Sequence, residues 1–205
     1  MEIGEKIRFG KYEWRVLALQ GEQALLMTEA IIEQRPYNDE YVTVTWADCS
    51  LRQYLNGAFY ESFDATEQAQ IQTTINQNFD NQWYGTAAGN ETADKIFLLS
   101  IEEVTCHYFG DSSDKLYYPK PNKRYWFERK DRNNPLRRAK FEDDRKWWWW
   151  LRSPGRLNLK AAYVHGDGNI GIQGNHVQKG NVGGPFHNGD SQGGVRPAMW
   201  IKRKA

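Results

Sequence analysis

The sequence is poor in cysteine, and its cysteines are not arranged for cross-linking or metal binding. Only two occur, Cys49 and Cys106. Two cysteines are too few for a disulfide scaffold, and they form no pair with the spacing of metal ligands. The sequence therefore predicts two free, buried thiols.

Long hydrophobic runs are also missing. No window approaches the roughly 18 apolar residues of a membrane-spanning helix, and the start, MEIGEKIRFG, has no apolar core of the signal-peptide type. We therefore predict no membrane contact. As given, the chain would stay in the cytoplasm, or be displayed as a phage or surface component by another route.

The chain has little net charge, but its charged residues are unevenly distributed along the sequence. The net charge is +1. Residues 1–119 carry eight Lys and Arg against nineteen Asp and Glu, residues 120–146 carry eleven against five, and residues 147–205 carry eight against two. The basic segment interleaves Tyr125, Trp126 and Phe127, a mixture typical of nucleic-acid surfaces, although its acidic residues dilute it.

The remaining composition indicates a folded protein. With 205 residues, 14% aromatic and 26% charged, the chain can bury a core, and we expect one domain over 1–205 of the α+β class. Alternation over 6–27, broken at Gly10 and Gly21, predicts a β-meander, and residues 193–202 predict a final strand. Helical spacing ends at Gly57, a residue suited to a C-terminal cap. We thus expect helices around 46–57 and 65–75, a strand at 95–100 and a short helix after Ser100.

Two later regions lack regular periodicity. Residues 110–144 alternate charges with Pro and Asn, which predicts an insertion or long excursion. Residues 155–194 hold eleven of the eighteen glycines and little aliphatic content, so we expect short strands threaded through surface loops.

Four consecutive tryptophans, Trp147 to Trp150, stand between these regions. As a strand they would point alternately to two faces. Four exposed indoles would form a larger apolar patch than soluble monomers usually tolerate. The run is therefore predicted to be a buried anchor.

The order SLRQYLNG, KIFLLSIEEV, WWLRSPG, AAYVHGDGNI and GGVRPAMWI resembles a bacterial and phage family of C-type-lectin-like fold. That family includes the variable proteins of diversity-generating retroelements, and the formylglycine-generating enzymes belong to the same superfamily. The resemblance implies that the N- and C-terminal strands pair, here Ile7 to Leu19 with Val195 to Lys202. It also implies two helices below and an irregular sheet with long loops above.

In the variable proteins, adenine mutagenesis changes asparagine codons in the upper loops, and the product binds a ligand. The resemblance therefore implies a non-enzymatic protein that binds a protein or glycan through residues 155–194 and needs no cofactor. Lys160, Gln173, Gln178, Lys179 and Gln192 cannot arise from asparagine codons in this way and depart from the pattern. The candidate ligand-binding residues are Arg156, Asn158, Tyr163, His165, Asn169, Gly171, Ile172, Asn175, His176, Asn181, Phe186, His187, Asn188, Asp190 and Ser191, with Tyr163, His165, His176 and Phe186 as the expected anchors.

Two alternatives from other classes stay open. His165, His176 and His187 recur every eleven residues and could hold a metal in an oxidase-like or other metalloenzyme if their loops converged. The carboxylates Asp167 and Asp190 are too few for calcium, and the cysteines lack the pairing that formylglycine generation needs. The second alternative is nucleic-acid binding through residues 120–146, a role that the resemblance does not imply. The sequence leaves the oligomeric state open.

Overall fold

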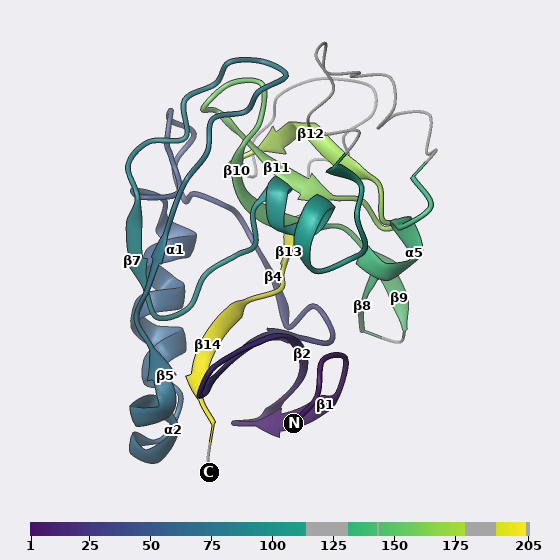
Figure 1. Ribbon diagram of the computed structural model, residues 1–205. Helices are drawn as coiled ribbons and strands as arrows, with labels where there is room; N and C mark the ends of the chain where they lie inside the picture. The colour runs from purple at the N-terminus through teal and green to yellow at the C-terminus, as the bar shows by residue number, and fades with distance from the viewer. Residues whose placement is uncertain (114–130, 143, 179–191, 204–205) are drawn as a thin grey trace.

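A computed structural model describes residues 1–113, 131–142, 144–178 and 192–203 (Figure 1). The protein has the predicted α+β architecture, with mostly antiparallel strands and a few short helices. Two five-stranded sheets lie one above the other in Figure 1, and helices α1 and α2 run along one side. Within the described residues, no helix has the length and apolar character needed to cross a membrane.

The first sheet contains the predicted meander. Its turns fall at Gly10 and Gly21, whose φ angles of +57° and +54° favour glycine. The last strand of the chain joins this sheet through an antiparallel pairing of Ala198 with Met27. In order across the sheet, the strands are β1 (Lys6–Phe9), β2 (Tyr12–Gln20), β3 (Gln23–Thr28), β14 (Ala198–Lys202) and β5 (Ile71–Gln72).

The expected pairing of the C-terminal strand with residues 7–19 is wrong in its partner. Strand β2 already has β1 on one side and β3 on the other, so both of its edges are used. The free edge that remains belongs to β3, and β14 pairs there. The N- and C-terminal segments therefore belong to the same sheet, but residues 7–19 form no backbone pairing with the last strand.

The second sheet carries the glycine-rich part of the chain. It contains short strands, as predicted: β11 and β12 form an antiparallel hairpin, and β10 pairs with β13 in parallel. In order, the strands are β12 (Ile170–His176), β11 (Lys160–Val164), β10 (Trp149–Pro154), β13 (Gly193–Val195) and β4 (Glu33–Arg35).

The helices are shorter than predicted. Helix α1 (Ser50–Tyr54) continues into a π-helical turn, η1 (Leu55–Phe59), and Gly57 lies inside this turn at a kink instead of capping it. Helix α2 (Ala65–Gln70) begins at the predicted Asp64–Glu67 capping box. It does not reach residue 75, because Ile71 pairs with Ile201 at the sheet edge.

The segment after Ser100 is helical, as predicted. Its capping box is complete, since Ser100 N donates to the Glu103 carboxylate (2.7 Å) and Glu103 N donates to Ser100 Oγ (3.2 Å). The helix passes into the π-helical turn η2 (Glu103–His107). The predicted strand at 95–100 is only a single bridge between Phe97 and Ala198. The remaining elements are β6 (Thr74–Asn76), β7 (Thr92–Asp94), α5 (Asn134–Arg137), β8 (Ala139–Phe141) and β9 (Arg145–Trp147).

The tryptophan run is a buried anchor, as predicted. Trp149 and Trp150 are 0% and 1% exposed, and Trp147 and Trp148 are half-buried against the same core. The run is split at Trp148, between β9 and β10. The indole of Trp149 donates to the Arg137 carbonyl (3.1 Å) and that of Trp150 to the Arg35 carbonyl (2.9 Å), so the buried N–H groups are satisfied.

Three buried arginines join segments that are distant in sequence. Arg152 donates to the Leu98 carbonyl (2.8 Å) and pairs with Glu103. Arg196 donates to the carbonyls of Thr28 (2.9 Å) and Glu29, and burial lowers its pKa to about 10. Arg137 pairs with Asp131 and donates to the Gly168 carbonyl (3.0 Å), so the described end of the 110–144 region is packed into the domain. These side chains satisfy backbone carbonyls that no strand partner reaches.

Candidate functional site

The β11–β12 hairpin separates core residues from surface residues. Ala161, Ala162, Val164, Ile170 and Ile172 are all buried. The remaining positions, apart from the glycines, are half-buried: Lys160, Tyr163, Gln173, Asn175 and His176. Burial lowers the pKa of Lys160, with a further contribution from Arg156, and burial raises that of Tyr163. The hairpin therefore has one face in the core and one available for other contacts.

Loops from three other parts of the chain meet the end of this hairpin. Tyr41 Oη lies 2.9 Å from His176 Nδ1, and Val44 N donates to the Asn158 carbonyl (2.9 Å). Asn158 Nδ2 in turn donates to the Ala87 carbonyl (3.0 Å). We call the side chains gathered here the hairpin-end patch, which consists of Tyr41, Val42, Arg156, Leu157, Asn158 and His176.

The hairpin-end patch is amphipathic. Tyr41, Val42 and Leu157 are 38%, 46% and 52% exposed, and they are three of the eight large apolar side chains that are exposed among the described residues. The backbone beneath the patch is held by hydrogen bonds, since Asn38 N donates to the Val177 carbonyl (2.8 Å). The patch thus combines exposed apolar groups with a hydrogen-bonded base, a combination suited to contact with another molecule.

The predicted binding residues do not form one surface. Arg156, Asn158 and His176 lie in the hairpin-end patch, and Asn175 is next to it. His165 and Asn169 lie in the turn at the opposite end of the hairpin, where His165 Nδ1 is 2.9 Å from Asp167 Oδ1. Asn181, Phe186, His187, Asn188, Asp190 and Ser191 fall outside the described residues.

Two predicted binding residues are buried, and their assignment is corrected. Ile172 is 0% exposed, because its side chain belongs to the core face of β12. Gly171 is also buried, beneath the ring of Tyr163. A Cβ atom at position 171 would lie 2.2 Å from Tyr163 Cε1. Neither residue can present a side chain to a ligand.

Tyr163 belongs to an aromatic cluster on the second sheet. Its ring packs edge-on against Trp148 with centroids 5.4 Å apart, and Trp148 packs in the same way against Trp150 at 4.7 Å. Gln173 Nε2 donates to Tyr163 Oη (3.3 Å). The tyrosine is therefore held by packing on one side and by a hydrogen bond at its hydroxyl.

The three predicted histidine ligands cannot share one metal ion. His176 pairs with Lys160, whereas His165 follows Val164 at the other end of the hairpin. Five residues of extended strand span about 16 Å, far more than two ligands of one ion can be apart. Within the described residues, no group of three His, Cys, Asp or Glu side chains is placed to hold a metal.

The basic segment 120–146 is described only in part, over 131–142 and 144–146. In that part Arg137 is buried and cannot meet a nucleic acid. The exposed basic residues there are Arg132, Arg138, Lys140, Arg145 and Lys146.

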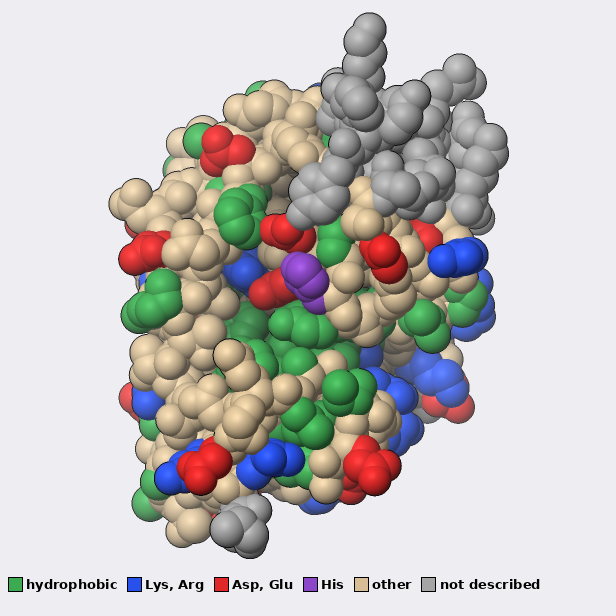
Figure 2. All heavy atoms as spheres, in the orientation of Figure 1, with side chains coloured by type: hydrophobic (Ala, Val, Ile, Leu, Met, Phe, Trp, Pro, Cys, Tyr) green, Lys and Arg blue, Asp and Glu red, His purple; other side chains and the backbone are tan. Residues whose placement is uncertain are grey.

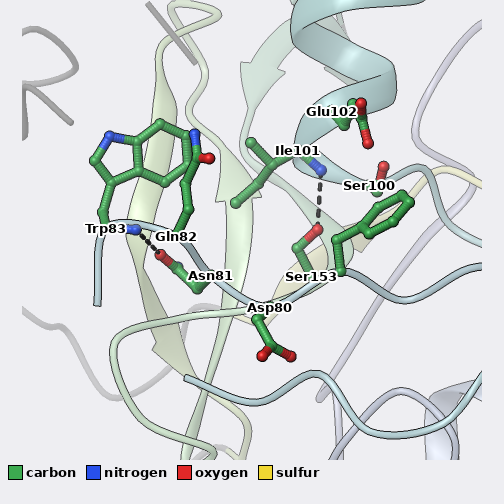
Figure 3. A pocket seen from close by; sticks show the side chains of 9 residues that line it. Asp80, Asn81, Gln82, Trp83, Ser100, Ile101, Glu102 and Ser153 are labelled. Carbon is green, nitrogen blue, oxygen red and sulfur yellow. Dashed lines mark hydrogen bonds between the residues drawn. The ribbon is translucent and has the colours of Figure 1, made fainter. Parts of the chain in front are cut away.

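Sequence reasoning missed a cavity of about 250 Å³ that lies beside the end of β10. It is formed by the loop 79–83, the start of the helix after Ser100, and Ser153 at the end of β10 (Figure 3). The signal in the sequence is NFDNQWYG, where three aromatic and three amide side chains occur within seven residues before a glycine. That pattern marks a turn, but nothing in it places Ser100 or Ser153 nearby.

Comparison with known proteins gives one match. A family model described as a domain of unknown function, DUF6273, matches residues 21–203. No curated protein and no solved structure matches the chain. The matched range includes the second sheet, the hairpin-end patch and the cavity, and it begins after strands β1 and β2 of the first sheet.

Proposed function

This chain belongs to the DUF6273 family, and we propose that it is a non-enzymatic binding domain of C-type-lectin-like fold. In this proposal it contacts a protein or glycan ligand through the hairpin-end patch and the adjoining parts of residues 155–194. The proposal includes the relationship to retroelement variable proteins that the sequence motifs suggest.

The observation that carries the proposal is the contrast between the patch and its base. Tyr41, Val42 and Leu157 are exposed, while the segments that hold them are joined by backbone hydrogen bonds from Asn38 and Val44. Because its backbone is already ordered, a surface of this kind loses little backbone conformational entropy when it binds a ligand. Side chains on it can also change without loss of core packing.

The chemistry of the patch fits a protein or glycan surface. Tyr41 is a rigid aromatic side chain with a polar end, and Asn158 and His176 offer adaptable hydrogen-bonding groups. Antibody paratopes use the same mixture of aromatic anchors and small polar groups. Asn158 and His176 are also compatible with an origin in mutated asparagine codons.

Several features of the architecture support the lectin-like part of the proposal. The N- and C-terminal segments share one sheet, a second sheet carries long loops, and helices lie along one side. The buried Arg152 and Arg196 come from WWLRSPG and GGVRPAMWI, the two segments with the strongest resemblance. In this proposal those motifs stabilise the fold, and the loops between them bind the ligand.

A patch variant tests the proposal directly. We expect Tyr41→Ala, Val42→Ser, Leu157→Ser and His176→Ala, combined in one chain, to abolish the binding that the wild type shows on an array of immobilised glycans. The melting temperature should change by only a few degrees, because exposed side chains contribute little to stability. Ile3→Ser, Ile75→Ser and Leu136→Ser, at exposed apolar positions elsewhere, form the matched control. Array binding that survives in the patch variant, or a large loss of its stability, would contradict the proposal.

A further inference from the structure

Strand β1 is an open edge of the first sheet. Among the described residues it pairs only with β2. Backbone groups along a strand face its two sides in turn. Val16 N donates to the Glu5 carbonyl (2.9 Å), so the backbone groups of Glu5 and Ile7 face β2. Those of Lys6 and Arg8 therefore face away from β2, where no described strand pairs with them.

The turn after β1 shows the same direction. Gly10 N, the next backbone donor on the outer side, donates to Glu67 Oε1 of helix α2 (2.9 Å). Glu67 thus closes the edge at the turn, and the edge stays open at Lys6 and Arg8. Because β1 has only 4 residues, the open part can pair with a short segment of chain.

A groove of about 1140 Å³ borders this open edge. One wall is β1, and the other walls come from α2 and from the end of β14 at Ile201 and Lys202. Phe9 and Ile201, both buried, give the groove apolar surface. Figure 1 shows β1, β14 and α2 together at the lower end of the molecule. Pockets for small molecules measure roughly 300–1,000 Å³, so this groove suits a peptide segment better.

The acidic residues of the groove already have partners. Asp64 and Glu67 form the capping box of α2, and Glu67 also accepts the hydrogen bond from Gly10. Glu22 Oε2 lies 3.7 Å from Lys202 Nζ. Figure 2 shows Asp and Glu side chains next to Lys and Arg side chains along this lower end. A cationic ligand would have to compete with these existing partners.

Two arginines of the groove have room for a further partner. The side chain of Arg8 is exposed and forms no ion pair within the described part of the chain. Glu13, which lies opposite Arg8 in β2, is instead 3.3 Å from Lys6 Nζ. Arg203 donates to the Gly21 carbonyl through Nη2 (2.8 Å), but its buried Nε has no acceptor among the described residues. Carboxylates on a ligand would offer these guanidinium groups charge-assisted hydrogen bonds.

We infer that the groove binds an extended segment of a partner protein, which pairs with β1 as an added antiparallel strand and carries acidic side chains at alternate positions. An antiparallel orientation is expected because the other pairings of this sheet are antiparallel. Peptide recognition by strand addition takes its affinity from backbone hydrogen bonds and its specificity from alternate side chains. This site is separate from the hairpin-end patch and does not depend on the proposed function.

The register of an added strand defines the sequence that it should have. Residues directly opposite in an antiparallel pair lie on the same face of the sheet, and opposite charges there stabilise the pair. The residues of the segment opposite Lys6 and Arg8 should therefore be acidic. The residues between them lie on the same face as Ile7 and Phe9 and should be apolar.

Two other occupants fit the groove less well. If β1 paired with β1 of a second copy, the positive side chains of Lys6 and Arg8 would lie opposite one another, which destabilises a strand pair. A nucleic acid requires a surface on which Lys and Arg predominate. The described lining of the groove has three basic and three acidic residues, namely Arg8, Lys202 and Arg203, and Glu22, Asp64 and Glu67.

Two synthetic peptides test the inference. The first, acetyl-Ser-Val-Glu-Val-Glu-Val-Ser-amide, carries a fluorescent label, and the second has Lys in place of both Glu. Each is titrated with the full chain, and fluorescence anisotropy measures binding. We expect saturable binding of the glutamate peptide and binding at least about tenfold weaker for the lysine peptide. Hydrogen exchange at the Arg8 amide, followed by NMR, should slow when the glutamate peptide is added, because this N–H gains an acceptor.

N-methylated peptides test the backbone pairing itself. Residues of an antiparallel strand that lie opposite Lys6 and Arg8 should exchange hydrogen bonds with them, so the N–H groups of both Glu should face β1. The N–H groups of the Val residues should face away. N-methylation of both Glu should therefore abolish binding, whereas N-methylation of two Val should change it by less than about threefold.

A variant locates the site. Arg8→Gln removes the charge without adding a new one beside Glu13, and it should weaken binding of the glutamate peptide severalfold and reduce the preference over the lysine peptide. Lys146→Gln, at an exposed basic residue outside the groove, should change neither. Both side chains are exposed, so folding should be retained, and circular dichroism checks this.

Several results would overturn the inference. They are no binding of the glutamate peptide, equal binding of the lysine peptide, equal binding of the two N-methylated peptides, or no effect of Arg8→Gln. A protein that sediments as a dimer, with its Arg8 amide already protected from exchange, would show instead that a second copy occupies the edge. Tighter binding of oligothymidylate than of the glutamate peptide, lost in Arg8→Gln, would show a nucleic-acid site.

Discussion

The ring of Tyr163 covers Gly171 so closely that a Cβ atom on Gly171 would lie 2.2 Å from it. The two residues face each other across the β11–β12 pairing. Gly171 had the sequence features of a variable position, but its lack of a side chain is what lets the tyrosine lie flat on the hairpin.

We expect Gly171→Ala to lower the free energy of unfolding by about 1–3 kcal/mol, because the added methyl group must displace Tyr163. Tyr163→Ala should relieve this, so the double variant should lose less than the sum of the two single losses. Urea denaturation measures all three. Gly166→Ala is the control, since its added Cβ would meet its nearest atoms at an ordinary 3.6 Å. Strict additivity in the double variant would argue against the contact.

Asn81 supports both the cavity and the second sheet. Asn81→Ala removes the donors to the Pro154 and Ile172 carbonyls and leaves buried acceptors without them. We expect a loss of roughly 2–4 kcal/mol in the free energy of unfolding. Asn90→Ala, at an exposed asparagine a few residues later, should change it by less than about 0.5 kcal/mol. Equal melting temperatures for the two variants would mean that the Asn81 bonds contribute nothing.

Glu29 should make stability depend on pH in the acid range. Burial raises the pKa of this carboxyl, but the hydrogen bonds and charges of Arg15 and Lys6 outweigh it, and the net shift is below the ordinary value of 4.5. Arg15 holds both oxygens, at 2.7 and 2.6 Å. The folded protein thus binds fewer protons than the unfolded chain, so this contribution is complete above pH 4.5 and is lost as the pH falls through the lower folded pKa.

Glu29→Gln should therefore cost about 0.5–1 kcal/mol at neutral pH, a modest figure because the pair is partly exposed and screened. The difference from wild type should disappear in acid. Urea titrations over a range of pH measure it, and Glu22→Gln, at a side chain that is 83% exposed, serves as the control. A difference that stays constant down to low pH would rule out the ion-pair origin.

The two cysteines should react at different rates. Cys49 is fully buried, and burial raises its thiol pKa to about 12, so little thiolate forms near neutral pH. Cys106 is only half-buried. We expect iodoacetamide to label Cys106 first in the native protein and both cysteines in urea, as read by mass spectrometry of tryptic peptides. Early labelling of Cys49 would show that the core around α1 opens readily.

The sequence predicted correctly those features that depend only on residues close together in the chain. The turns at Gly10 and Gly21, the Asp64–Glu67 and Ser100–Glu103 capping boxes and the burial of Trp149 and Trp150 follow from neighbouring residues, and the structure has them all. The end of α2 was missed because Ile71 is captured by Ile201, a partner 130 residues away. Tertiary pairing overrode the helical pattern there.

The sequence predicted correctly only those residues of the candidate site whose polar side chains favour the surface. Arg156, Asn158 and His176 lie on the surface as expected, but Ile172 faces the core, since alternation along β12 and not its place in a polar region sets its direction. The separation of His165 from His176 depends on hairpin register, which periodic spacing in the sequence does not reveal. The cavity was missed because its walls come from three distant segments.

The last two strands of the chain are needed to complete both sheets. Strands β13 and β14 follow each other in sequence, yet β13 sits inside the second sheet and β14 inside the first. Until residues 193–202 have been synthesised, β3 has no β14 to pair with and β10 has no β13. The earlier part of the chain therefore cannot complete either sheet. Folding should accordingly be late and slow, because contacts between the two ends of a chain carry a large loop-closure cost.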